Sequence, residues 1–411
     1  MIACHECGLF LRAPVVPPGG AARCPRCASE LYERKAHDFE LPLNLYLAAL
    51  ILFIIANAFP FITFEMEGLE ETSILISGVI EFYRQGFWSL AGLVFLVAIL
   101  IPLVKITASL YILAPLQFGN RSAFAPRVFR MVERLRPWAM MEVYLLGVIV
   151  AYVKLRDMAN LELGPGVFAF VALIIALAWA DSALEPHAVW ERLGPQAPRQ
   201  APRIGSTGIR ALTACHSCGL VVSGQAANTG VKRACPRCGA TLHRRKTNSV
   251  ARTWALVATA TILYIPANIF PVMTVITFGS GEADTIISGV KTFIEVGMWP
   301  LALLVFFASI TVPVLKLVGL TYLLISVQRR SRGRLKDRTL MYRIIEQVGR
   351  WSMVDIFMIA ILIALVRLGS IASIEPGVGA VSFAAVVVIT MFASMSFDPR
   401  LMWDAAGENR E

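Results

Sequence analysis

The feature that most constrains the fold is a set of eight long apolar runs, each near the ~20 residues that a helix needs to cross a bilayer. They lie at roughly residues 42–62, 88–115, 138–156, 166–184, 252–275, 299–326, 351–368 and 378–397. The chain is 57% hydrophobic and 16% charged, whereas an ordinary soluble domain carries roughly 25% charged residues. This composition excludes a disordered chain, a secreted mini-protein and a soluble enzyme. It predicts an all-α polytopic membrane protein.

The second half of the sequence repeats the first. An offset of 211 residues matches Asn57 with Asn268, Pro60 with Pro271, Trp88 with Trp299, Pro102 with Pro313, Lys105 with Lys316, and Tyr111 with Tyr322. After a two-residue insertion, an offset of 213 matches Trp138 with Trp351, Glu142 with Asp355, and Trp190 with Trp403. Such agreement in register does not arise by chance. We therefore expect a tandem repeat of two units, each with four membrane-spanning helices, in the same orientation.

The charges of the loops predict that orientation. Five arginines lie between residues 121 and 136, and a longer basic stretch follows the sixth apolar run. The loop after the first run is acidic instead, with Glu65, Glu67, Glu70 and Glu71. Loops rich in Lys and Arg remain in the cytoplasm, so we expect cytoplasmic N- and C-termini. The net charge of +10 then reflects orientation, and no nucleic-acid partner is expected.

All eight cysteines belong to two copies of the pattern C-x2-C-x16-C-x2-C. The first copy contains Cys4, Cys7, Cys24 and Cys27, and the second contains Cys215, Cys218, Cys235 and Cys238. This spacing is typical of a zinc ribbon, a small β module in which two tight turns supply four thiolates to one metal ion. We expect two structural zinc ions. A rubredoxin-like iron centre is an alternative, because Cys24 and Cys235 each begin a Cys-Pro-x-Cys turn, and redox-active thiols are another.

These patterns divide the chain into five segments. We expect a first zinc ribbon at 1–40, a first transmembrane unit at 41–190, a cytoplasmic linker at 191–210, a second zinc ribbon at 211–248, and a second transmembrane unit at 249–405.

Four charged residues fall inside the predicted spans, where each costs roughly 2.5–3.5 kcal/mol. Lys105 and Lys316 each follow a proline by three residues, and Glu142 and Asp355 lie about one turn into the third span of each unit. All four fall in the cytoplasmic half of the membrane. A Lys–acid pair within each unit is therefore expected, either as a structural ion pair or as a site that titrates or contacts a transported group.

Hydroxyl side chains favour the second unit as the functional one. Ser309 lies two helical turns before Lys316, Ser352 lies three residues before Asp355, and Thr390 lies at similar depth in the last span. Their counterparts in the first unit are Ala98, Ala139 and Leu177. We therefore predict a site for transport or proton coupling formed by Ser309, Lys316, Ser352, Asp355 and Thr390, with Lys105 and Glu142 as weaker counterparts.

The duplicated cysteine pattern, with N-x-x-P, S-G-V, P-x-x-K and W-x-M-x-[DE] in register in both halves, resembles the paraquat-inducible protein A family. That family includes the LetA proteins, which work beside MCE-domain tunnels. The resemblance implies a multi-pass protein of the bacterial inner membrane that helps to move phospholipid between membranes. It also implies a periplasmic MCE tunnel protein as partner, zinc-ribbon domains, and a function for the polar cluster of the second unit.

Two other functions remain open at this stage. A membrane redox protein would use the cysteine modules as rubredoxin-like centres, and a passive scaffold for a periplasmic partner would not need the buried Lys–Asp pair. The chain contains no phosphate-binding loop of the type G-x-x-x-x-G-K-[ST]. We therefore expect no enzyme activity, and any energy must come from an ion gradient or a partner.

Overall fold

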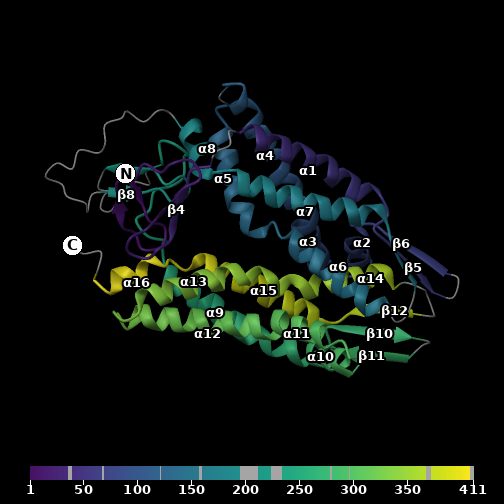
Figure 1. Ribbon diagram of the computed structural model, residues 1–411. Coiled ribbons are helices and arrows are strands. Elements are labelled where there is room, and N and C mark those ends of the chain that lie inside the picture. The colour runs from purple at the N-terminus through teal and green to yellow at the C-terminus, as the bar shows by residue number, and fades with distance from the viewer. Residues whose placement is uncertain are drawn as a thin grey trace.

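The structure is a computed structural model that describes residues 1–35, 39–66, 69–120, 122–156, 160–194, 212–223, 234–277, 280–295, 297–366 and 372–407. Eight helical stretches within these ranges are long and apolar enough to cross a membrane. Both cysteine modules lie at one end of the helices, and most of the longer strands lie at the opposite end (Figure 1). The predicted linker 191–210 lies outside the described residues from residue 195 onward.

The two halves present the same elements in the same order. The first contains α1 (Glu40–Ala58), α3 (Trp88–Phe95), α4 (Ile101–Gln117), α5 (Ala125–Leu135), α6 (Met141–Arg156), α7 (Pro165–Ala183) and α8 (Pro186–Leu193). The second contains α9 (Ser249–Ile269), α11 (Trp299–Phe306), α12 (Val312–Gln328), α13 (Leu335–Val348), α14 (Val354–Leu365), α15 (Val378–Ser396) and α16 (Arg400–Ala405). Short 3-10 turns, Arg136–Trp138 and Gly349–Met353, join α5 to α6 and α13 to α14.

A π-helical turn interrupts the second span of each half. Leu96–Leu100 joins α3 to α4, and Phe307–Thr311 joins α11 to α12. Each turn lies just before a proline, Pro102 or Pro313. Proline lacks the backbone N–H that would bond to the carbonyl four residues earlier, so the helix widens locally there. The polar residues on α4 and α12 follow directly after this irregular turn.

The prediction of an all-α fold is wrong at the end opposite the cysteine modules. One antiparallel sheet there contains β5 (Ile62–Met66), β6 (Leu69–Ser73) and β7 (Asn160–Leu163), with β5 in the centre. A second contains β10 (Met273–Thr277), β11 (Ser280–Asp284) and β12 (Ala372–Pro376), with β10 in the centre. Ile62 and Phe64 are buried while Thr63 is only half-buried, the alternation of a strand. The apolar run that predicts the first span extends to residue 62 and so masks the two-residue period of this strand.

Short helices follow both hairpins. They are α2 (Ser77–Arg84) and α10 (Ile286–Glu295).

Helix α14 lies at the centre of the molecule. All twelve of its residues are buried, because it packs against α6 and α2 of the first half as well as against its own unit. Two glycines permit this approach. A Cβ on Gly147 of α6 would lie 2.9 Å from Cβ of Phe357, and a Cβ on Gly78 of α2 would lie 2.5 Å from the carbonyl oxygen of Ala360.

Each cysteine module is a pair of small turns with short strands. The first contains β1 (Ile2–Ala3), β2 (Phe10–Leu11), β3 (Ala21–Arg23) and β4 (Glu30–Glu33), paired as two hairpins. The second contains the hairpin of β8 (Leu212–Ala214) with β9 (Val221–Ser223) and a bridge between Ala234 and Thr241. These elements agree with the predicted small β modules.

Candidate metal centres and membrane polar sites

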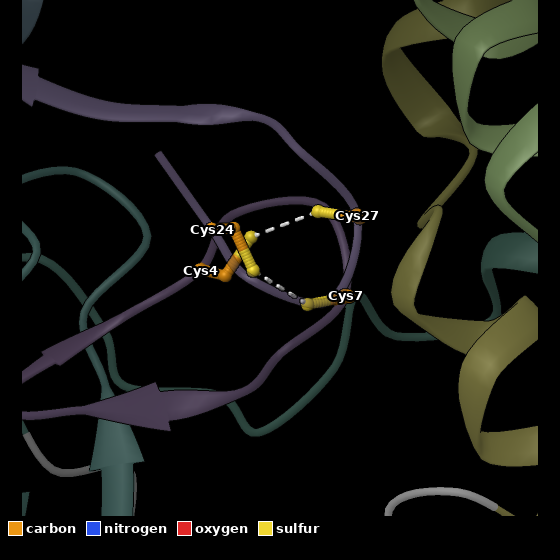
Figure 2. Close-up of side chains that lie close together, drawn as sticks. All are labelled: Cys4, Cys7, Cys24 and Cys27. Atoms are coloured by element: carbon orange, nitrogen blue, oxygen red, sulfur yellow. Dashed lines mark hydrogen bonds between the residues drawn. The ribbon is translucent and has the colours of Figure 1, made fainter. Parts of the chain in front are cut away.

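Four buried thiols converge in each cysteine module. In the first, the sulfurs of Cys4 and Cys27 are 3.5 Å apart and those of Cys7 and Cys24 are 3.6 Å apart, pointing toward one another (Figure 2). In the second, the pairs Cys215–Cys238 and Cys218–Cys235 are both separated by 3.5 Å. Within each group all sulfurs lie within 4.8 Å of one another.

These distances fit a tetrahedral metal ion. Zinc–sulfur bonds of about 2.3 Å place the four sulfurs of a tetrahedral site about 3.8 Å apart. The set of four thiolates with no open position suits a structural ion. Each group could therefore hold one metal ion, and the short modules would gain folding energy from it.

The turns that present the cysteines need a left-handed backbone. Gly8, Gly219 and Gly239 have φ angles of +75°, +68° and +69°. Each donates its N–H to the carbonyl of the first cysteine in its turn. The fourth turn has Ala28 instead of glycine, yet it keeps φ at +56° and the bond to the Cys24 carbonyl at 2.9 Å. The turn at Ala28 therefore carries backbone strain that the three turns with glycine avoid.

The two modules dock crosswise. In the second half, Arg343 of α13 donates to the Cys27 carbonyl of the first module at 3.2 Å. In the first half, Arg130 of α5 donates to the Cys238 carbonyl of the second module at 3.0 Å. Both arginines and both cysteines are counterparts in the repeat. The cysteine turns of each module thus contact the unit that the module does not precede in sequence.

Further contacts secure the first module on the second unit. Arg400 donates to the His5 carbonyl at 3.0 Å, and the Arg26 guanidinium lies 5.7 Å from the ring centre of Trp403. Burial raises the pKa of Glu6 to about 7, and nearby Arg343 opposes that shift. Sequence order gave no sign of this docking.

The five residues of the predicted cluster in the second unit are all buried. Ser309, Lys316, Ser352, Asp355 and Thr390 are each at most 4% exposed. The Lys316 ammonium donates to the Gly349 carbonyl at 2.9 Å and to the Thr390 hydroxyl at 3.2 Å. Lys316 thus bonds to a turn and to α15, and the expected pair with Asp355 is not formed in this arrangement.

Asp355 is buried without a hydrogen bond. Among the residues that the structure describes, neither oxygen of its carboxylate has a hydrogen-bond partner, and the hydroxyls of Ser309 and Ser352 are also unpaired. Ser309 lies close enough to interact with the carboxylate, but not in the geometry of a hydrogen bond. The Asp355 carboxylate and the two serine hydroxyls could therefore form further hydrogen bonds that this arrangement does not contain.

In the first unit Lys105 has a different partner from the expected one. It forms an ion pair with Asp181 of α7, and the Tyr46 hydroxyl donates to the other oxygen of that carboxylate at 2.7 Å. Glu142 is exposed instead of paired with Lys105. The sequence did not point to Asp181 as the partner of Lys105, because it lies two residues from the end of its span. A charge costs little there and therefore does not indicate a special role.

The chain matches one family profile and several known proteins. The family profile described as "Paraquat-inducible protein A" matches residues 40–194 and 250–407. The chain is 33% identical to "Intermembrane transport protein PqiA" of Escherichia coli, over 99% of this chain and 96% of that protein. It is 32% identical to "Lipophilic envelope-spanning tunnel protein A" of the same species, over 98% and 91%. A "Probable intermembrane transport protein" of Haemophilus influenzae is 28% identical over 98% and 95%. No solved structure matches.

Proposed function

Because the chain belongs to the paraquat-inducible protein A family, we propose that it is the inner-membrane component of an intermembrane lipid transport system. In this role it loads or extracts phospholipid for a periplasmic MCE tunnel protein. The names of the relatives support an intermembrane transport role, and eight apolar helices support a multi-pass membrane protein.

The charge distribution supports an orientation with the cysteine modules in the cytoplasm. The segment 329–338 at that end is rich in Arg and Lys, whereas β5, β6 and β7 at the opposite end carry Glu65, Glu70, Glu71 and Glu162. We propose zinc as the metal of both modules. We also propose that the chain is divided into ribbons 1–40 and 211–248, units 41–190 and 249–405, and a linker at 191–210. In this division the second ribbon and unit repeat the first.

The observation that carries the mechanism is the unpartnered Asp355 carboxylate inside a sealed cluster that also contains Lys316. A charged carboxylate without hydrogen bonds is costly to bury, so this arrangement favours a side chain that gains or loses a proton when its surroundings change. The Lys316 ammonium donates two of its three N–H groups to Gly349 and Thr390. The third N–H group could donate to a carboxylate.

A small helix movement would change these contacts. A cavity of about 310 Å³ lies beside Gly349 and is lined by Arg343, Glu346 and Ser394, so water can approach the carbonyl that holds Lys316. If Lys316 turns toward Asp355, the pair favours the charged forms, and Asp355 releases its proton to water that enters from this cavity. The membrane potential contributes about 2.3 kcal/mol per charge per 100 mV, enough to bias this step and the lipid movement coupled to it.

Growth complementation of a strain that lacks the protein, under membrane stress, tests the proposal. We expect Asp355→Asn and Lys316→Ala to abolish growth while the protein remains folded, inserted and bound to its partner. The first-unit changes Glu142→Gln and Lys105→Ala are expected to be milder. Protein abundance is measured in parallel. Full growth with Asp355→Asn would leave the scaffold function as the better explanation.

A further inference from the structure

One cavity of the first unit brings several charged side chains together. It measures about 320 Å³ and is lined by Lys105 of α4, Arg136 of the 3-10 turn, Glu142 of α6 and Asp181 of α7, with Pro102 and Leu177 among its apolar walls. Four charged groups, two of each sign, therefore share one partly apolar cavity.

Two of these charges have no close partner. Lys105 and Asp181 form an ion pair, whereas Arg136 and Glu142 take part in no ion pair within 4 Å and no side-chain hydrogen bond among the described residues. Arg136 does interact electrostatically with Glu133 from a longer distance. Arg136 and Glu142 are both exposed, so each can reach a ligand.

The cavity lies at the start of α6 and the end of α7, where we expect lipid headgroups. Asp181 is two residues from the end of α7, Glu142 is the second residue of α6, and Arg136 belongs to the turn before it. These positions adjoin α5 and α8, which lie on the side of the cysteine modules (Figure 1). An exposed carboxylate on a membrane helix at this depth is stabilised by a cation.

We propose that this cavity binds the headgroup of a zwitterionic phospholipid with a primary ammonium, that is, a phosphatidylethanolamine. Arg136, beside Lys105, donates charge-assisted hydrogen bonds to the phosphate, and Glu142 accepts hydrogen bonds from the ammonium. The apolar wall with Pro102 and Leu177 contacts the start of the acyl chains. The purpose of this site rests on the proposed role in lipid transport, whereas binding of the lipid does not require that transport occurs.

The balance of charge selects this class of lipid. The four groups sum to zero, so an anionic phosphatidylglycerol gains nothing from its net charge and leaves Glu142 unpaired. A choline headgroup has no N–H to donate to Glu142. Only a headgroup with both a phosphate and an N–H cation satisfies both free side chains.

Native mass spectrometry of the full-length protein, released from nanodiscs with equal phosphatidylethanolamine and phosphatidylglycerol, tests the site. We expect wild type to retain phosphatidylethanolamine preferentially. Glu142→Gln gives the cavity a net positive charge, so retention should shift toward phosphatidylglycerol by about tenfold, as expected for one charge-assisted bond of ~1.4 kcal/mol. Arg136→Gln should lower the retention of both lipids. The matched controls are Glu162→Gln, on β7 at the far end, and Arg134→Gln, which does not line the cavity.

Other outcomes overturn the proposal. Equal retention of both lipids by wild type, or an unchanged preference in Glu142→Gln with an unchanged thermal midpoint, would exclude the site. Displacement by water-soluble glycerophosphoethanolamine without retained lipid would assign the cavity to a soluble phosphoester. Asp355→Asn should retain phosphatidylethanolamine as wild type does. Failure of the headgroup site would appear in the lipids retained by wild type and Glu142→Gln. Failure of the proton-coupling proposal would appear as full growth with Asp355→Asn, so the two failures can be told apart.

Discussion

The two halves of the molecule place a buried lysine at the same position of the same helix and then surround it differently. Lys105 meets an acid, Asp181, with Tyr46 as a second partner. Lys316 meets a backbone carbonyl and Thr390, because the counterparts of Tyr46 and Asp181 are Val257 and Ser394. The first lysine is neutralised locally, and the second is not.

A second residue difference between the halves changes what lies beside each lysine. Arg136 in the first half corresponds to Gly349 in the second. An arginine leaves a charged side chain at the mouth of a cavity, whereas the glycine lets the Lys316 ammonium approach the backbone. The two halves thus place their lysines differently: Lys105 is paired with an acid beside a charged cavity, whereas Lys316 is buried among neutral partners. This division suits a protein in which one half contacts lipid and the other couples energy.

The largest expected effect comes from removing a metal. Cys215→Ser with Cys218→Ser should lower zinc content by one ion per chain and reduce protein abundance, because structural zinc contributes apparent binding energies of about 10–16 kcal/mol. Crosswise docking predicts that hydrogen exchange then rises in α5 and α8 of the first half. Cys4→Ser with Cys7→Ser should instead affect α13 and α16.

Elemental analysis and hydrogen-exchange mass spectrometry measure both effects. An unchanged zinc content in the double variant would contradict the zinc ribbon. Exchange that rises in the unit following the altered module in sequence would contradict crosswise docking as the source of the stability.

Breaking the first lysine's ion pair should have the next largest effect. Asp181→Ala leaves the Lys105 ammonium, 6% exposed, without its acid. Removing one partner of a buried pair costs about 3–5 kcal/mol, and the partial exposure of Asp181, 30%, places the expected loss near ~3 kcal/mol. Ser394→Ala at the counterpart position should cost less than about 1 kcal/mol. Denaturant unfolding in detergent compares the two, and equal losses would contradict the difference between the halves.

A smaller effect is expected from filling the space that Gly349 leaves. A Cβ there would lie 2.6 Å from Cε and 2.8 Å from Nζ of Lys316. Because the lysine is buried on all sides, Gly349→Ala should lower the free energy of unfolding by about 1–3 kcal/mol. Arg136→Ala, at the exposed counterpart, should leave the free energy of unfolding within about 0.5 kcal/mol of wild type. If both variants unfold alike, the second cluster is not as tightly sealed as the structure shows.

Much of this architecture follows from the sequence, because its signals are local. The eight helices follow from runs of apolar residues, and the convergence of each set of thiols follows from cysteine spacing. The family membership predicted from the repeated motifs is confirmed. The burial of Ser309, Ser352 and Thr390, like that of Lys316 and Asp355, follows from their place in apolar spans, and their common role stays a prediction.

What the sequence did not reveal depends on contacts between distant segments. The pairing of Lys105 with Asp181 joins residues 76 positions apart, and the bond from Arg343 to Cys27 spans 316 positions. Both required knowledge of which helix faces which. The strands β5 to β7 were missed for another reason, since their short alternating segments adjoin apolar runs that mask them.

The smallest expected effect concerns the strained turn of the first module. Ala28 corresponds to Gly239, and both residues have positive φ, +56° and +69°. A left-handed alanine costs about 1–2 kcal/mol, partly offset by the ~0.5–1 kcal/mol that glycine loses in chain entropy on folding. Ala28→Gly should therefore stabilise its module by about 0.5–1 kcal/mol, and Gly239→Ala should destabilise its own by a similar amount. The added Cβ at Gly239 meets no atom closer than the Arg130 Nη1 at 4.0 Å, so the effect isolates the backbone. Since module folding is coupled to metal binding, the chelator concentration that removes half of the metal should shift about threefold upward for Ala28→Gly and downward for Gly239→Ala. Shifts of the same sign in both variants would show that the alanine turn is stabilised by contacts that the glycine turn lacks.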